Sequence, residues 1–380
     1  MADKQVLIIS FWNPTDENPH QGNFIQDQAA AICNICYNSI FLQVNVLNSN
    51  HVLFKKSVEE SEFYKGKRIT INLYSIFWKF LYVNPWWLAG VIFRIINKRR
   101  DEIKPEIIHA NVIHPCGIVG YLLSEKLGTK LLISEHWSKA EKFLKHPIYG
   151  NIALKAYRKC YAIICVSKFL AQKLAKATGH SNLLVVPNII NTEIFNYQPK
   201  TTDSENLNFM CVASWRPPKR LDLIFEALCS FALEFKKPIN LRVVGNGVQT
   251  EKYRALKPPG NLKIEWLGYL DKSAIAGILH NTDLFMHASD IETFSIVTVE
   301  ALATGTPVIS SNVGALPELI NDRNGVLAEN NSDAWLNCVR EAVAKQYDNK
   351  AISREQDRYS PEKVGSRIVK IYTQTTSNLF

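Results

Sequence analysis

The chain has 380 residues, 44 Lys and Arg against 35 Asp and Glu, and 47% hydrophobic residues. This length exceeds the size at which a single hydrophobic core usually stops growing, so we expect two domains. A charged fraction of 21% is ordinary for a globular protein, and the absence of a low-complexity tract excludes a fibrous or wholly disordered chain.

The first half of the sequence alternates apolar segments with helical patterns. In chain order, the segments that predict strands are VLIIS (6–10), SIFLQVNVLN (39–48), ITINLYSI (69–76), EIIHANV (106–112), KLLISEH (130–136), AIICVS (162–167) and LLVVPN (183–188). Because helical segments separate most of these strands, they predict a parallel sheet with helices on its faces.

The second half repeats this alternation after the polar stretch 197–208, which is typical of a linker. Its predicted strands are LNFMCVAS (207–214), LRVVGNG (241–247), LKIEWLGYL (262–270), DLFMHAS (283–289), PVISSN (307–312) and GVLAE (325–329). The sequence therefore predicts an α/β protein with two doubly wound domains.

Two glutamates, Glu292 and Glu300, flank the turn that leads from the strand at 283–289 into a predicted helix at 295–303. A loop at the carboxyl end of a parallel strand opens where α/β ligands bind, and the helix that follows favours an anion such as phosphate. Two carboxylates in that place can accept hydrogen bonds from separate hydroxyl groups. The pattern indicates a phosphorylated, sugar-bearing ligand.

A simpler interpretation of the same residues is structural. Exposed glutamates are usually only solvated, and the β-branched side chains Ile296, Val297 and Val299 favour a strand by propensity.

The stretch 289–320 also resembles the signature of the retaining glycosyltransferases of family four, the group-one family. In that signature E-x7-E is followed by an alanine-rich helix, a G-x-P-V strand and a G-x-x-x-E turn. The matching residues here are Glu292, Glu300, Ala301, Gly305, Pro307, Val308, Gly314, Pro317 and Glu318.

The family's E-G-F-G opening is altered in this chain. It stands here as Glu292, Thr293, Phe294 and Ser295, so both glycines are replaced. The resemblance implies that the backbone from Thr293 to Ile296 still approaches the donor sugar.

This resemblance implies two Rossmann-like doubly wound domains facing a cleft, the GT-B architecture. Residues 1–195 would form the acceptor-binding domain and residues 205–357 the domain that binds the nucleotide-sugar donor. In this architecture the last helix, here within 359–380, is expected to pack back on the first domain. The segment 167–195 resembles the element that closes that first domain.

The family's diphosphate-binding element is similar to residues 214–228, SWRPPKRLDLIFEAL. Lys219 fits the position of the lysine that reaches the diphosphate. Arg216 is the candidate for the accompanying arginine, and Arg220 is an alternative that could share the task. Cations here would neutralise the charge that develops on the departing diphosphate.

Several glycines in the second half are expected to let the nucleotide approach bare backbone. Gly245 and Gly247 end a predicted strand, although a lone G-x-G is a weak motif. Gly268 and Tyr269 resemble the family element whose main chain contacts the base.

In the first half, Gly22 within NPHQGNFIQDQAAA (18–31) resembles the family glycine that lets backbone amides reach the sugar phosphate. The segment HANVIHPCG resembles the family's H-x-H element, with Asn111 in the second histidine position and His114 three residues later. This element lies near the acceptor in the family, and either Asn111, as a donor-binding residue, or His114 could contact the donor or the acceptor. His136, at the end of a predicted strand, is the other candidate. A histidine in such a place can equally be structural.

The resemblance implies a retaining transfer. Glu300 would hold the nucleotide ribose, Glu292 the hydroxyls of the donor sugar, and Lys219 with Arg216 the diphosphate. The sequence has no D-x-D and no cluster with metal-ligand spacing, so neither a metal nor another cofactor is expected.

The partners expected are a nucleotide-sugar donor and a glycan or lipid-linked acceptor. Alternatives are a nucleotide-sugar 2-epimerase of the same architecture and a non-enzymatic basic binder of membrane or nucleic acid.

The basic residues are concentrated in one half. Residues 1–190 contain 23 Lys and Arg against 13 Asp and Glu, whereas residues 191–380 contain 21 against 22. This imbalance predicts a surface that faces a membrane, a nucleic acid or a phosphorylated acceptor.

The segment 77–100 favours the membrane among these partners, and we expect no nucleic acid. It contains Trp78, Trp86 and Trp87 and ends in three basic residues, but it is too interrupted to span a bilayer. The alternative is that its apolar face packs on the sheet, and the two interpretations are compatible. Since MADKQ leads directly into the first strand, we expect no signal peptide and a cytoplasmic protein, with the inner face of the membrane as its working location.

Overall fold

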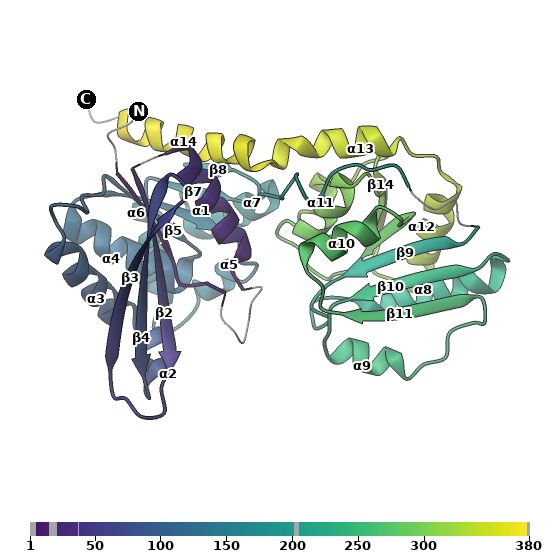
Figure 1. Ribbon diagram of the computed structural model, residues 1–380, viewed down its shortest axis with the longest axis horizontal. Helices are drawn as coiled ribbons and strands as arrows, with labels where there is room; N and C mark the ends of the chain where they lie inside the picture. Colours follow the sequence, from purple (N-terminus) through teal and green to yellow (C-terminus); the bar gives the residue numbers. More distant parts are fainter. Residues whose placement is uncertain (1–4, 15–20, 37, 201–204, 378–380) are drawn as a thin grey trace. The chain divides into compact units, whose positions relative to one another are not determined.

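The computed structural model describes residues 5–14, 21–36, 38–200 and 205–377. The chain divides into two compact units, residues 1–189 with 361–380 and residues 190–360. Each unit contains one largely parallel sheet with helices packed around it (Figure 1). The predicted α/β fold with two doubly wound domains is confirmed.

The sheet of the first unit has the order β3-β4-β2-β1-β5-β6-β7-β8. Its strands are β1 (Val6–Ser10), β2 (Ser39–Asn48), β3 (Lys55–Phe63), β4 (Gly66–Ser75), β5 (Ile107–Asn111), β6 (Lys130–Glu135), β7 (Ala162–Cys165) and β8 (Leu183–Val185). The central strand β1 is buried along its whole length, which explains its continuous run of apolar residues. The chain order reverses between β1 and β5, and ligands of doubly wound sheets bind at such a point.

One strand of this sheet was not predicted. Strand β3 pairs antiparallel with β4 and forms the edge of the sheet. Its sequence, KKSVEESEF, is mostly charged and largely exposed, because an edge strand needs neighbours on only one side and charged side chains protect it from further pairing. The pattern of buried strands therefore does not detect it.

The helices of the first unit are α1 (Asn23–Ile35), α2 (Trp78–Tyr82), α3 (Pro85–Lys98), α4 (Ile118–Leu127), α5 (Ala140–Phe143), α6 (Gly150–Lys159), α7 (Lys168–Thr178) and α14 (Pro361–Ser377). The last helix, yellow in Figure 1, lies beside α1, purple, and belongs to the first unit. Val364, Ile368 and Tyr372 of α14 share a buried cluster with Ile25 and Ile32 of α1.

The Trp-rich segment 77–100 contains two helices, α2 and α3. Helix α3 buries Leu88, Ile92 and Ile96, so its apolar face packs in the interior as one interpretation expected. Trp86, on its other side, is exposed. Among the described residues, every helix is too short or too polar to cross a bilayer.

The sheet of the second unit is entirely parallel and has the order β11-β10-β9-β12-β13-β14. Its strands are β9 (Leu207–Val212), β10 (Ile239–Val244), β11 (Leu262–Gly268), β12 (Leu284–His287), β13 (Val308–Ser311) and β14 (Gly325–Ala328). Here the chain order reverses between β9 and β12, so the loops that follow these two strands meet at the ligand-binding edge.

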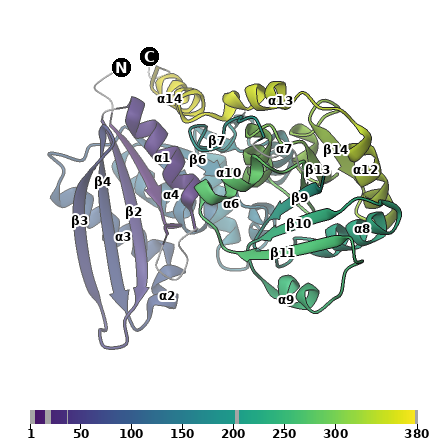
Figure 2. The same ribbon diagram turned by 45° about the vertical axis from the view of Figure 1, so that its right-hand side comes forward.

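Six α-helices surround this second sheet in the described part of the chain. They are α8 (Leu221–Glu234), α9 (Val248–Arg254), α10 (Lys272–Leu279), α11 (Ile296–Ala303), α12 (Ser332–Ala344) and α13 (Asn349–Glu355). Figure 2, which turns the view by 45°, shows α8 and α12 close together beside the sheet. They enclose a core that contains Trp215, Phe231 and Trp335.

Candidate functional site

In the second unit, the loops after β9 and β12 come together at the point where the strand order reverses. The amide of Asp290 donates a hydrogen bond to the carbonyl oxygen of Pro218 at 2.9 Å, and Lys219 forms an isolated β-bridge with Ser289. These backbone contacts hold Lys219 opposite the loop that carries Glu292.

The Nζ atom of Lys219 forms an ion pair with Oε1 of Glu292. The same carboxylate oxygen lies 2.8 Å from Nε2 of His287, which ends β12 and is itself 3.4 Å from the lysine. Burial alone would raise the pKa of Glu292, but Lys219 and His287 outweigh it and lower that pKa to about 2. Glu292 is therefore ionised, and it accepts hydrogen bonds.

The backbone conformation of Ser295 shows how the altered segment E-T-F-S, residues 292–295, folds. Its φ of 75° lies in the left-handed region that favours glycine, so the serine keeps a conformation suited to the glycine it replaces. Its Oγ lies 3.2 Å from Nε2 of His287 and 2.8 Å from Oγ1 of Thr298. These contacts offset the strain of the unusual backbone. Next to it, Phe294 is buried against the ring of Tyr359.

Glu300 lies in the second turn of α11 and is only 6% exposed. This helix forms although Ile296, Val297 and Val299 favour strands, because a helix buried in an α/β layer gains more from packing than it loses in propensity. The structural interpretation of Glu300 as a solvated surface residue is therefore wrong. Ile296 begins the helix, and Thr293 is half-buried in the loop before it.

Gly314 packs directly on the backbone of Glu292. It has φ 59°, and a Cβ atom at this position would lie 2.1 Å from the carbonyl oxygen of Glu292. The amide of the next residue, Ala315, donates to that same oxygen at 3.0 Å. The G-x-x-x-E turn thus supports the loop that carries Glu292.

The two arginines of the predicted diphosphate loop differ in their surroundings. Arg220 forms ion pairs with Asp222 and Asp290, and its hydrogen bond to Asp222 raises its pKa further. Arg216 is exposed, and its Nε donates to the hydroxyl of Ser214. Arg216 is therefore the arginine better placed to turn toward a ligand.

The glycines predicted near the nucleotide also lie at carboxyl ends of strands. Gly245 and Gly247 follow β10 and precede α9, and Gly268 ends β11. The amide of Gly245 donates to the carbonyl oxygen of Gly268 at 2.6 Å, which ties the two turns together. Tyr269, directly after, is exposed.

In the first unit, the candidates lie at the carboxyl ends of β1, β5 and β6. Gly22, directly before α1, has φ 72°, and a Cβ atom there would lie 1.9 Å from the carbonyl oxygen of Trp12. Residues 18–20 of the predicted glycine loop lie outside the described residues. The ring of Phe24, two residues later, lies 4.6 Å from the ring of His136 and is tilted by 45° to it. The start of α1 and His136 are therefore adjacent.

Asn111 ends β5, and its side chain is buried without a hydrogen-bond partner among the described residues. A buried amide group that lacks a partner is unfavourable. The next residue, Val112, has φ 67°, which is strained for a β-branched side chain. Strain and an unsatisfied amide in one place are typical of a ligand-binding site.

His114 and His136 are both held neutral. Burial, with a smaller effect of His146, lowers the pKa of His114 to about 4. Burial also lowers the pKa of His136 to about 4, although a 2.9 Å contact with Oδ1 of Asn188 opposes the shift. Both histidines can therefore offer neutral hydrogen-bonding groups to an acceptor.

Sequence reasoning missed Glu135, which organises this edge of the first unit. Its buried carboxylate accepts hydrogen bonds from the amides of Ile113, His136 and Trp137 at 2.8 to 2.9 Å, and from the hydroxyl of Tyr157 at 2.6 Å. Burial raises its pKa, and these hydrogen bonds oppose the rise. The signal that could have found it is a glutamate at the end of an otherwise apolar strand.

Aromatic side chains that the sequence analysis did not single out surround these residues. The rings of Trp12 and Trp137 lie 6.4 Å apart, and the ring of His114 lies at a tilt 4.8 Å from that of Phe143 and 5.5 Å from that of Tyr149. Flat apolar rings with polar groups between them suit a sugar, whose C–H faces are apolar and whose edges carry hydroxyls.

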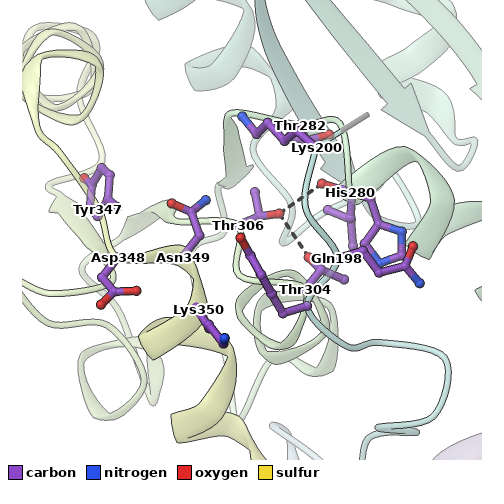
Figure 3. Close-up of a pocket in the computed structure, with 12 residues that line it drawn as sticks. Gln198, Lys200, His280, Thr282, Thr304, Thr306, Tyr347, Asp348, Asn349 and Lys350 are labelled. Carbon is purple, nitrogen blue, oxygen red and sulfur yellow. Dashed lines mark hydrogen bonds between the residues drawn. The ribbon is translucent and has the colours of Figure 1, made fainter. Parts of the chain in front are cut away.

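A cavity of 530 Å³ in the second unit lies away from the candidate residues (Figure 3). It is lined by residues that include Thr282, before β12, Thr304 and Thr306, before β13, and Asn349, at the start of α13. Ligands of doubly wound sheets bind at the opposite edge. In the described part of the chain, no group of three or more His, Cys, Asp or Glu is arranged to hold a metal ion.

Comparisons with known proteins agree with this geometry. Residues 194–358 match the family described as glycosyl transferases group 1, and residues 51–194 match glycosyltransferase family 4. An uncharacterized glycosyltransferase of Methanocaldococcus jannaschii is 27% identical over 336 residues, which cover 85% of this chain and 89% of that protein.

A relative from Mycobacterium tuberculosis is named GDP-mannose-dependent alpha-(1-6)-phosphatidylinositol dimannoside mannosyltransferase. It is 25% identical over 192 residues, 48% of this chain and 49% of that protein. The solved structure of sucrose-phosphate synthase from Thermosynechococcus elongatus has the same fold, with a TM-score of 0.73 at 15% identity over 98% of this chain and 99% of that one. The chain therefore belongs to the group-one glycosyltransferases of family four, and its fold is the GT-B fold.

Proposed function

We propose that this glycosyltransferase moves a sugar from a nucleotide-sugar donor to a hydroxyl group of a glycan or a lipid-linked acceptor, with retention of configuration and without a metal ion. The reaction would serve the synthesis of a cell-surface polysaccharide or glycolipid. The observation that carries this proposal is the ion pair of Lys219 with Glu292 at the ligand-binding edge of the second unit, beside the start of α11.

Lys219 would stabilise the departing nucleotide diphosphate, assisted by Arg216. An ammonium group has three N–H donors, so Lys219 can hold Glu292 and a phosphate oxygen at the same time. Arg216 is exposed, and its Nε donates a hydrogen bond to the hydroxyl of Ser214. Positive side chains in this place would supply the charge stabilisation that a divalent ion supplies elsewhere.

Glu292 and Glu300 would hold different parts of the donor. Glu292 is ionised because its pKa is about 2, and it would accept hydrogen bonds from hydroxyls of the donor sugar. Glu300, one helix turn beyond the start of α11, would accept hydrogen bonds from the ribose. Glycines Gly245 and Gly268 would let the nucleotide approach the backbone of the β10 and β11 turns.

The configuration of the sugar would be retained if the acceptor hydroxyl attacked from the same face of the donor sugar that the diphosphate leaves. The bond from the sugar to the diphosphate oxygen breaks, the bond to the acceptor oxygen forms, and the diphosphate takes the acceptor proton. No enzymic nucleophile takes part, so Glu292 would not act as a glycosidase carboxylate does. Asn111, His114 and His136 of the first unit would position the acceptor.

Two observations support a glycan or lipid-linked acceptor. The aromatic side chains around His114 in the first unit suit a sugar ring. The name of the mycobacterial relative specifies GDP-mannose and phosphatidylinositol dimannoside. We propose a cytoplasmic enzyme that works at the inner face of an anionic membrane, with no nucleic-acid partner.

A thermal-shift series with UDP, GDP and ADP tests the donor assignment, because a bound ligand raises the unfolding temperature with its concentration. We expect one nucleotide to stabilise the wild type, and Glu300→Ala to bind it more weakly by about 2–3 kcal/mol, or roughly 30- to 150-fold. Glu341→Ala, an exposed glutamate on α12, is the matched control. If none of these nucleotides shifts the transition, the donor assignment fails.

A turnover assay separates the transferase from the 2-epimerase alternative. Nucleotide release from the matching nucleotide-sugar should increase when glycan or lipid-linked hydroxyl acceptors are added. Conversion of the nucleotide-sugar into its 2-epimer in the absence of an acceptor would instead identify the epimerase.

A further inference from the structure

The first unit carries an exposed apolar patch that the transfer reaction does not use. It consists of Leu53, Phe54, Phe77, Phe80, Trp86 and Ile148. Phe80 is 67% exposed and Leu53 is 71% exposed, which is unusual for side chains of this size. Single exposed apolar residues are common, but a group of large ones on one surface marks an interaction site.

Ring contacts connect segments that carry residues of this apolar patch. The ring of Phe54 lies 5.4 Å from that of Trp87, next to Trp86. The ring of Trp86 lies 6.1 Å from that of Tyr149, which follows Ile148. These contacts join the loop before β3, the start of α3 and the segment before α6 into one surface.

Helix α2 contributes Phe80 to the same end of the unit, and Phe77 directly precedes this helix. It packs on β2 and β4, and both Figures 1 and 2 place it at the end of the sheet where β2 and β4 finish and β3 begins. The amide of Ile76 donates to the carbonyl oxygen of Val52 at 3.0 Å, which ties the start of this segment to the loop before β3.

The surroundings of the apolar patch are basic. Lys55 and Lys56 follow Phe54, and Lys79 lies between Phe77 and Phe80, and all three lysines are exposed. Residues 50–58 and 76–100 contain no Asp or Glu. An apolar surface bordered by positive charge complements the interface of an anionic bilayer, where rings enter the headgroup region and lysines meet phosphates.

We propose that the apolar patch docks the first unit on an anionic lipid bilayer. This inference rests on the proposed function, because docking would bring the enzyme to a lipid-linked acceptor that lies in such a bilayer. A second copy of the chain is a poorer partner, because a symmetric contact through this patch would bring the same lysines together. The apolar face of α3 is buried in the unit, so this helix cannot lie flat on the bilayer with that face inserted. The bilayer would instead contact α2, Trp86 and the loop before β3.

Vesicle co-sedimentation of the full chain tests the proposal, with phosphatidylcholine vesicles compared to vesicles that contain 30% phosphatidylglycerol. We expect the wild type to bind the anionic vesicles at least tenfold more tightly, and this preference to weaken in high salt. Phe77→Glu combined with Phe80→Glu should reduce binding to anionic vesicles at least tenfold. Lys55→Glu combined with Lys56→Glu should remove most of the dependence on salt.

Leu233→Glu is the matched control, because Leu233 is 81% exposed on α8 of the second unit; it should bind vesicles as the wild type does. The proposal is overturned if the wild type does not bind anionic vesicles in low salt, or if the Phe77 and Phe80 variant binds them equally well. It is also overturned if that variant has a different oligomeric state by light scattering while its binding to anionic vesicles is unchanged.

The nucleotide thermal shift, measured on the same preparations, keeps this test separate from that of the proposed function. Unchanged nucleotide stabilisation in the Phe77 and Phe80 variant shows that it is folded. Nucleotide binding without vesicle binding rejects the docking surface alone. Vesicle binding without nucleotide binding rejects the proposed donor alone.

Discussion

Lys219 and Glu292 are 73 residues apart in the sequence, yet their side chains form an ion pair in the second unit. The pair exists because the strand order reverses between β9 and β12, which brings the loops after both strands together. His287, buried at the end of β12, contacts both partners. A cation and an anion are thus held ready where the donor is proposed to bind.

Replacing Lys219 by methionine should remove the charge proposed to stabilise the leaving diphosphate. We expect kcat to fall by roughly 10²- to 10³-fold, with a smaller loss in Lys219→Arg because the charge is kept. Steady-state kinetics on the donor and acceptor identified in the turnover assay measures this effect. Lys237→Ala, a change of an exposed lysine after α8, should leave kcat unchanged, and an equal loss in both variants would reject the role of Lys219.

Replacing Gly314 by alanine should displace the loop of Glu292, because the new Cβ would lie 2.1 Å from the carbonyl oxygen of Glu292. We expect a destabilisation of about 1–3 kcal/mol in urea unfolding, from strain at φ 59° and from the forced shift. Gly260→Ala is the control, since nothing lies within 4 Å of a Cβ there. If both variants unfold at the same urea concentration, the contact of Gly314 with Glu292 does not constrain the loop.

Replacing Glu135 by alanine should leave the amides of Ile113, His136 and Trp137 without their carboxylate acceptor. Loss of hydrogen-bond partners for buried groups costs about 1–3 kcal/mol each, so we expect at least about 3 kcal/mol less stability for the first unit. Chemical denaturation followed by tryptophan fluorescence measures this loss. Glu125→Ala, on the exposed side of α4, should change little; a similarly small effect for Glu135 would refute its organising role.

The stability of the first unit should fall as the pH decreases from about 6.5 to 4. The pKa of His136 is lowered from 6.5 to about 4 by burial, so in this range the unfolded chain binds a proton that the folded unit excludes. By linkage, stability then rises with pH across the same window, by up to about 3 kcal/mol for this residue. Urea unfolding at several pH values measures the slope.

His136→Gln removes this titrating group and should make that slope shallower, whereas His51→Gln, a change of an exposed histidine, should not. An unchanged slope in His136→Gln would show that His136 is not the group that couples protonation to folding.

Particular residues show how far the sequence predicts the candidate site. The separation of Glu292 from Glu300 is a local pattern, and the strand, turn and helix around it form as predicted. The serine at position 295 did not predict the φ of 75°, because its contacts with His287 and Thr298, which offset the strain of that conformation, exist only in the folded unit. Glu135 escaped prediction because its partners come from three different segments.

The sequence by itself determined the alternation of strands and helices, the two doubly wound domains and the family, because apolar periodicity and short motifs are properties of neighbouring residues. Only the tertiary structure decided that Lys219 meets Glu292, that Arg220 is engaged by two aspartates, that β3 forms an edge, and that the apolar patch of the first unit is left exposed. Such relationships depend on which strands lie side by side, and strand order is set by packing over the whole unit.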